Sequence, residues 1–164
     1  SVVAIDVGRG QLHESLRADP RVDARERTNI RSVDPAAVGA PFELLVADLS
    51  FISLRIVMAD LFALVSDDTP MVLLVKPQFE AGKPEVDRGS GVIRDPEVWE
   101  RVLTEVERSI CGHGAAIMEG MVSPITGADG NVEFFVHVMS GATPSFDPAV
   151  LVAEALDLTG EGGS

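Results

Sequence analysis

Apolar residues in this chain gather in short runs, separated by stretches in which they recur with helical spacing. The runs at 2–6, 42–51 and 71–75 are typical of strands buried in a sheet, and 21–26 reads as a weaker strand. Spacings of three and four residues indicate helices at 11–20 and 53–65, and a third from Asp95 to Gly112 or Gly114. One helical turn is expected after Asp34, because Pro35 would occupy its first position.

The second half of the chain predicts a hairpin and a loop. Strands at 115–122 and 131–139 are separated only by the turn-rich residues 123–130, so we expect them to pair antiparallel. Residues 80–95 are polar and punctuated by Gly and Pro, which predicts a long loop. After residue 140 the pattern indicates a tail with one short helix at 147–157.

Helices that alternate with buried strands predict an α/β fold. The sheet should be mostly parallel, with helices on both faces and an antiparallel last strand. In such sheets ligands bind at the carboxyl ends of the strands. This edge is therefore where chemistry is expected.

Charged residues stand where the predicted strands end. Asp6, Asp48 and Lys76 each follow an apolar run, and Glu133 lies within the start of the last predicted strand. Any one of these charges could simply be solvated. Gathered at one edge, however, a lysine and carboxylates suit proton abstraction from a hydroxyl, so the pattern favours a site.

Composition narrows the range of functions. The net charge is −13, which counts against a simple polyanion binder unless the basic surface is local or lies on another segment. The three histidines are scattered and Cys111 is the only cysteine, so no metal site is predicted. No apolar run is long enough to span a membrane, and a single cysteine fits the reducing cytoplasm.

Six ordered motifs between residues 2 and 138 carry a specific resemblance. The chain resembles the haemolysin A (TlyA-type) family of ribosomal RNA 2′-O-methyltransferases, within the FtsJ-like class. The motifs are DVGRGQL, ERTNIR, VADLSFISL, LVKPQFEAGKPEV with GVIRDP, and SPITGADGNVEFF. The resemblance implies a Rossmann-like sheet and transfer of a methyl group from S-adenosylmethionine to a ribose 2′-hydroxyl, that of a cytidine, in ribosomal RNA.

The resemblance also assigns roles to residues. Asp48, Lys76 and Glu133 match three positions of the family's catalytic tetrad, in which Lys76 would orient and deprotonate the hydroxyl. Asp6 would bind the ribose of the cofactor and Asn29 would lie on its adenine side, with Asp48 also beside the cofactor. The RNA-facing cations would be few, and solvation is an open alternative for each of them: Lys83, Arg88 and Arg94.

Three parts expected of the family have no counterpart in the sequence: the first tetrad lysine, the glycine-rich first strand and turn, and an S4-type RNA-binding domain. We therefore expect residues 1–139 to be a partial methyltransferase domain with its first strand missing. Such a chain should be inactive alone and should self-associate through the gap. The alternatives are a non-catalytic RNA- or cofactor-binding module and, less in keeping with the acidic charge, a haemolysin-like membrane activity.

Overall fold

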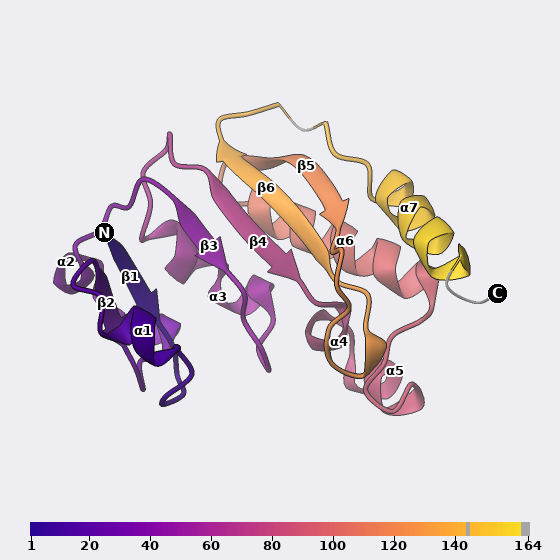
Figure 1. Cartoon of the computed structure of the whole chain (residues 1–164). Helices are drawn as coiled ribbons and strands as arrows, with labels where there is room; N and C mark the ends of the chain where they lie inside the picture. Colours follow the sequence, from indigo (N-terminus) through magenta and orange to yellow (C-terminus); the bar gives the residue numbers. More distant parts are fainter. Residues whose placement is uncertain (144, 162–164) are drawn as a thin grey trace.

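The computed structural model describes residues 1–143 and 145–161, which contain two separate sheets (Figure 1). Strands β1 (Val2–Ile5) and β2 (Val22–Arg25) form a parallel pair. The larger sheet has the order β3-β4-β6-β5. Its strands are β3 (Leu45–Ala47), β4 (Met71–Val75), β5 (Ala115–Val122) and β6 (Phe134–Ser140). The α/β class is confirmed.

Strand directions in the larger sheet set up its functional edge. β3 and β4 are parallel, whereas β6 lies between β4 and β5 and is antiparallel to both. The predicted antiparallel pairing of the last two strands is thus confirmed. Val75 at the end of β4 pairs with Phe134 at the start of β6. Lys76, which follows β4, and Glu133, which precedes β6, therefore lie at the same edge of the sheet.

Three longer helices pack on one face of the larger sheet. They are α3 (Leu54–Phe62), α6 (Pro96–Cys111) and α7 (Pro148–Glu161). Ser53 and Asp95 cap the first two, and the side chain of each accepts a hydrogen bond from a backbone N–H of the first turn. The apolar stripes of these helices meet the alternate strand residues that include Leu73, Phe134 and Val136.

The prediction of helices on both faces is wrong for the larger sheet. Along β3, Leu45 and Ala47 are buried but Val46 between them is 66% exposed. Such alternation is typical of a strand covered on one side only. The apolar runs that predicted fully buried strands were too short to separate these two cases.

Most other elements are short. They are α1 (Glu14–Arg17), η1 (Ile30–Ser32), α2 (Pro35–Val38), α4 (Pro77–Glu80), α5 (Lys83–Arg88) and η2 (Ala128–Gly130). The turn predicted after Asp34 is α2, with Asp34 as its cap. The loop predicted at 80–95 is wrong in part, since it contains α5. Pro84 lies in the first turn of α5, and Glu85 accepts a hydrogen bond from the Gly82 N–H, so residues that read as loop punctuation start a helix.

Helix α7 packs against β5 and α6. Gly120 of β5 allows the close approach, because a Cβ there would lie 2.7 Å from the Phe146 ring and 2.9 Å from Leu151. Residues 144 and 162–164 of the predicted tail lie outside the described residues. The domain boundary placed near residue 139 stays a prediction.

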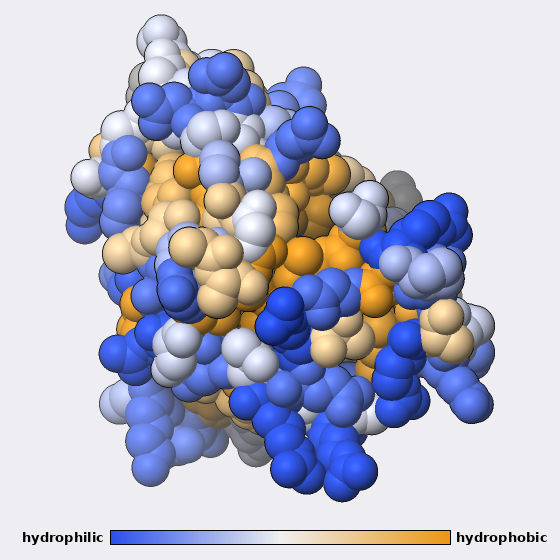
Figure 2. Space-filling view, turned by 90° about the vertical axis from the view of Figure 1, so that its left-hand side faces the viewer, coloured by the Kyte–Doolittle hydropathy of each residue, from blue (hydrophilic) through white to orange (hydrophobic). Residues whose placement is uncertain are grey.

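Among residues 1–143 and 145–161 no ladder joins the two sheets, and the strands on either side of the gap between them carry exposed apolar residues. On β1, Val2 is 59% exposed, and Leu44, just before β3, is 56% exposed. Figure 2 looks at the molecule from the side of β1 and β2, and apolar surface lies in the middle of this view between polar margins. We refer to Val2, Leu44 and Val46 together as the gap surface.

Candidate active site

An ion pair joins the ends of β3 and β4. The Nζ atom of Lys76 lies 2.6 Å from Oδ1 of Asp48 and also donates to Oγ of Ser50 at 3.4 Å. The Lys76 side chain is only 12% exposed, whereas that of Asp48 is 64% exposed. The amine is thus covered by protein and held by a carboxylate that remains open to solvent.

Local sequence explains why Lys76 stops at the edge. It is the residue before α4, and its backbone is extended (φ −114°, ψ 101°). Pro77 follows at the first position of α4. A proline favours an extended backbone in the residue before it. Its missing N–H costs nothing here, because the first N–H groups of a helix have no partner within the helix. The chain therefore turns immediately after β4, and Lys76 stays beside the end of β3.

Glu133 lies just before β6 rather than within a strand, which corrects the sequence prediction. β6 starts at Phe134, three residues after the predicted start at 131, because Asn131 turns toward another loop. Its side chain accepts from the Ile93 N–H and donates to the Gly91 carbonyl, both at 3.0 Å. Glu133 is only 6% exposed, and its Oε1 accepts a hydrogen bond from Nε2 of Gln78 at 2.8 Å. Asp48, Lys76 and Glu133 thus meet at one edge.

Two of the three residues predicted for the cofactor, Asp6 and Asn29, lie in loops that follow the strands of the smaller sheet. Asp6 follows β1 and accepts a hydrogen bond from the Gly8 N–H at 2.6 Å. The Thr28 N–H donates to the Asp6 carbonyl, which brings the loop that contains Asn29 beside it. Asn29 caps η1 by accepting from the Arg31 N–H. Both side chains are exposed, but they lie beside the smaller sheet, whereas Lys76 follows a strand of the larger one.

The three cations predicted to face RNA are exposed. Lys83 and Arg88 lie at the two ends of α5, and Arg94 precedes α6. Within the described residues none of them forms an ion pair. They are therefore available to a polyanion, but their exposure equally fits solvation.

Sequence reasoning missed Phe51. Its side chain is 91% exposed, and its backbone adopts a left-handed conformation (φ 63°) that non-glycine residues seldom take. The ring packs against Phe79, with centroids 5.1 Å apart. Phe51 directly follows Ser50, which contacts Lys76. The sequence did contain a signal for this residue, because an aromatic side chain is unusual in the turn that follows the aspartate at the end of a strand.

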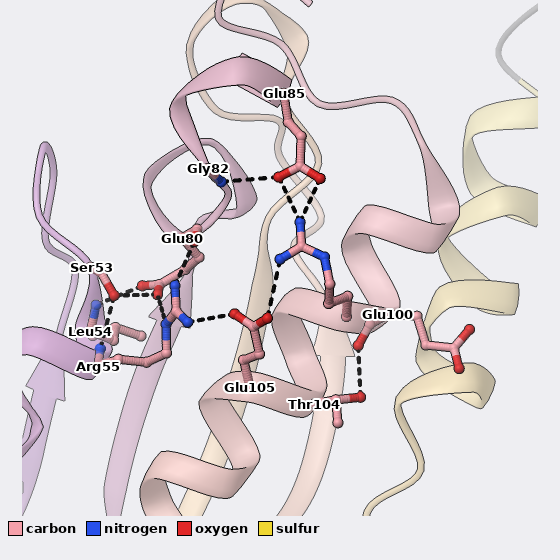
Figure 3. A network of polar contacts seen from close by, with 10 residues as sticks. Ser53, Leu54, Arg55, Glu80, Gly82, Glu85, Glu100, Thr104 and Glu105 are labelled. Atoms are coloured by element: carbon pink, nitrogen blue, oxygen red, sulfur yellow. Dashed lines mark hydrogen bonds and ion pairs between the residues drawn. The ribbon is translucent and has the colours of Figure 1, made fainter. Parts of the chain in front are cut away.

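A network of ionic contacts, also missed, fixes the helices that follow Lys76 (Figure 3). Glu80 at the end of α4 is 4% exposed. It accepts from Oγ of Ser53 at 2.5 Å, from the Leu54 N–H at 2.6 Å and from Nε of Arg55 at 3.1 Å. This buried carboxylate therefore ties the end of α4 to the first turn of α3, where unpaired N–H groups favour negative charge.

The same network continues to α5. Arg55 also contacts Glu105 of α6, which Arg101 contacts as well, and Arg101 in turn donates to both carboxylate oxygens of Glu85. The Gly82 N–H first, and then the Arg101 guanidinium, hold the pKa of the Glu85 carboxyl below its usual value. Because the folded-state pKa is lowered, this support is present at neutral pH and is lost as the pH falls through that pKa.

The site opens to solvent at the edge of the sheet, where the Asp48 side chain is exposed. Two hollows of the described surface have volumes of about 360 Å³, along α6, and about 200 Å³, between β5 and α7. Neither is lined by Asp48, Lys76 or Glu133. The described residues contain no group of three or more His, Cys, Asp or Glu side chains that could hold a metal ion. Every helix among them is too short or too polar to cross a membrane.

Comparison with known proteins identifies the family. The model of the FtsJ-like methyltransferases matches residues 1–139. The chain belongs to the FtsJ-like methyltransferase family.

Curated relatives of this chain include ribosomal RNA methyltransferases. It is 49% identical over 135 residues to "16S/23S rRNA (cytidine-2'-O)-methyltransferase TlyA" of Mycobacterium tuberculosis, covering 82% of this chain and 50% of that protein. It is 43% identical over 137 residues to "Putative rRNA methyltransferase YqxC" of Bacillus subtilis, covering 82% and 48%. The chain thus spans about half the length of these relatives.

A solved structure shares the arrangement of the elements. It is titled "Putative hemolysin from Streptococcus thermophilus", and it superposes with a TM-score of 0.90 at 33% identity. The match covers 98% of this chain and 60% of that one. The arrangement of helices and strands described above is therefore shared with this related structure over the part that the match covers.

The buried position of Glu80 generates a stability prediction. Glu80→Ala should lower the free energy of unfolding by about 3 kcal/mol, because it leaves a buried N–H without an acceptor. Glu105→Ala is the matched control. Its side chain is 27% exposed, so it should cost less than about 1 kcal/mol. Urea denaturation measures both, and equal losses would show that Glu80 does not anchor α4.

Proposed function

We propose that this chain carries the methyl-transfer site of a ribosomal RNA 2′-O-methyltransferase that uses S-adenosylmethionine. The observation that carries the proposal is the covered amine of Lys76, held by Asp48 and placed one strand away from Glu133. An amine between two carboxylates suits a neutral hydroxyl that must be oriented and must lose its proton. The relatives that modify cytidine ribose support this substrate.

The residues of this chain divide the work as follows. Lys76 Nζ holds the ribose 2′-hydroxyl. Once the amine has given its own extra proton to solvent, it takes the hydroxyl proton as the oxygen forms its bond to the methyl group. Asp48 keeps the amine in place, and Glu133 adds negative charge on the other side. S-adenosylmethionine would supply an electrophilic methyl group, whose bond to sulfur breaks. Such catalysis is largely positioning, which suits side chains fixed at strand ends.

The structure offers partial support for the cofactor. The exposed Asp6 carboxylate, at the carboxyl end of a parallel strand, is chemically suited to the ribose hydroxyls of S-adenosylmethionine. Asn29, in the adjoining loop, would lie on the adenine side, and Asp48 would face the reactive end. These residues fit opposite ends of the cofactor and come from separate sheets, so the cofactor would lie across the gap between them.

The RNA would approach the same edge. Phe51 offers an exposed ring beside the Lys76 site, and aromatic rings bind unpaired bases by stacking. Lys83, Arg88 and Arg94 would contact phosphates. Because ribosomal RNA is the proposed substrate, we expect the protein to act in the cytoplasm.

Lys76 is the direct test of the chemistry. In the complete natural protein that contains this chain, Lys76→Ala should reduce methyl transfer by about 10³-fold or more, because the proton acceptor is lost. Binding of S-adenosylmethionine, measured by calorimetry, should stay near that of the unaltered protein. Lys76→Arg, which keeps the charge but cannot take a proton, should be equally inactive. Activity that survived either change would contradict the assigned role.

Phe51 should affect RNA binding alone. Phe51→Ala should raise KM for the RNA substrate about tenfold, since stacking on one base contributes about 1–3 kcal/mol. Phe51→Tyr retains the ring and should retain the KM. An unchanged KM in Phe51→Ala, measured in steady-state methylation assays, would remove the ring from the substrate site.

The gap surface calls for a partner. Val2, Leu44 and Val46 expose apolar groups beside strand edges with unpaired backbone groups, which is a surface that binds a further strand. We propose that in the isolated chain a second copy binds to the gap surface. We also propose that the chain does not catalyse methyl transfer while this surface is uncovered.

Self-association can be measured by light scattering during size-exclusion chromatography. The 164-residue chain should show a dimer mass that falls on dilution, and Val46→Lys should make it monomeric. Ile56→Lys is the control, because Ile56 is a similarly exposed apolar residue on α3 outside the gap surface. A monomer at every concentration, or equal effects of the two lysines, would contradict the proposal.

A further inference from the structure

The carboxylate of Glu133 is held on one side by Gln78. Nε2 of Gln78 donates to Oε1 of Glu133 at 2.8 Å. Gln78 lies two residues after Lys76, in the four-residue helix α4. The same short helix therefore starts at the amine and reaches the carboxylate, and the ionic contacts of Glu80 anchor its far end.

The orientation of the Gln78 amide follows from this contact. Its other atom, Oε1, is buried and accepts no hydrogen bond from the described residues. Reversing the amide would place this oxygen against the carboxylate, where two acceptors would repel each other. A buried acceptor without a hydrogen bond is unusual in folded proteins. The orientation of the amide therefore follows from the hydrogen bond that Nε2 donates to Glu133, although it leaves Oε1 of Gln78 without a donor among the described residues.

Gly127 closes the other side. A Cβ atom at Gly127 would lie 2.1 Å from Oε1 of Glu133 and 2.6 Å from its Cδ, and all three of its nearest atoms belong to Glu133. The backbone of Gly127 is not in the left-handed region, so an alanine could adopt it. What requires glycine here is the position of the carboxylate.

The turn around Gly127 cannot easily withdraw. The Gly127 N–H donates to the Asn131 carbonyl at 2.8 Å. Asn131 is 3% exposed, and its side chain is bonded to the backbone of Gly91 and Ile93. Pressure from a methyl group at Gly127 would therefore move the Glu133 side chain rather than the turn.

We infer that Gln78 and Gly127 are positioning residues that fix the carboxylate of Glu133 for methyl transfer. Gln78 donates to Oε1, and the absence of a side chain at Gly127 leaves the space that this oxygen occupies. The other oxygen, Oε2, accepts no hydrogen bond from the described residues, so it is the oxygen left to act at the site. This inference rests on the proposed function, in which Glu133 takes part in the transfer.

The test is a set of double-mutant cycles on kcat in the complete natural protein, with ribosomal RNA as substrate. Gly127→Ala and Gln78→Leu should each lower kcat by about 10- to 100-fold, because a shift of about 1 Å at a reacting group costs that much. The Kd for S-adenosylmethionine should change less than about threefold. In a Glu133→Ala background, neither change should lower kcat further.

A matched control and a second readout separate the outcomes. Gly82→Ala adds the same methyl group near another carboxylate, 3.5 Å from Oε2 of Glu85, and should leave kcat unchanged. In thermal unfolding of the 164-residue chain, Gly127→Ala should lower Tm when Glu133 is present and have little effect in Glu133→Ala.

Each result has one meaning. Full activity in Glu133→Ala would overturn the role of Glu133 in the proposed function. Loss of activity in Glu133→Ala, with normal kcat in Gly127→Ala and Gln78→Leu, would overturn only the positioning inference. Effects that add to Glu133→Ala would show that the two residues act through the fold and not through the carboxylate.

Discussion

A charged amine at the end of a buried strand has to be paired, and much of this structure follows from how Lys76 is paired. β4 is the most deeply buried strand of the larger sheet, and its chain ends on a cation that is 12% exposed. Asp48 supplies the opposite charge from the end of β3, because parallel strands bring their carboxyl ends to one edge. Pro77 then turns the chain so that the amine remains there.

The turn after Lys76 extends this constraint to neighbouring elements. α4 carries Gln78 to Glu133, and Glu80 joins its end to the start of α3. From Glu80 the ionic contacts run through α6 to α5, which carries Lys83 and Arg88. A single short helix thus links the amine, the second carboxylate and the surface proposed to face RNA.

The sequence predicted the strand ends well because they depend on local pattern. An apolar run followed by a charge identified Asp6, Asp48 and Lys76 as strand ends, and the helical turn expected after Asp34 is present as α2. The sequence placed Glu133 inside the last strand, which in fact starts at Phe134, because the buried turn of Asn131 depends on contacts about 40 residues away. For the same reason Gln78 and Glu80, whose partners are distant in sequence, were not found.

The gap between the sheets has a different origin. Within the described part of the chain, β1 and β3 each form a ladder of backbone hydrogen bonds with one neighbouring strand only. The apolar pattern within either strand does not show how many neighbours the strand has. A cofactor held by Asp6 on one sheet and Asp48 on the other would depend on what fills this gap. The proposed chemistry and the proposed association are therefore linked through one surface.

The measurement that tests the central claim most directly is the position of the transferred methyl group. The complete natural protein would be incubated with ribosomal subunits and S-adenosylmethionine labelled in its methyl group. The RNA would then be digested to nucleosides and separated by mass. We predict label in a 2′-O-methylated nucleoside, with cytidine as the base. Label on a base, or no transfer to RNA, would contradict the assignment of Lys76, Asp48 and Glu133 to a ribose hydroxyl.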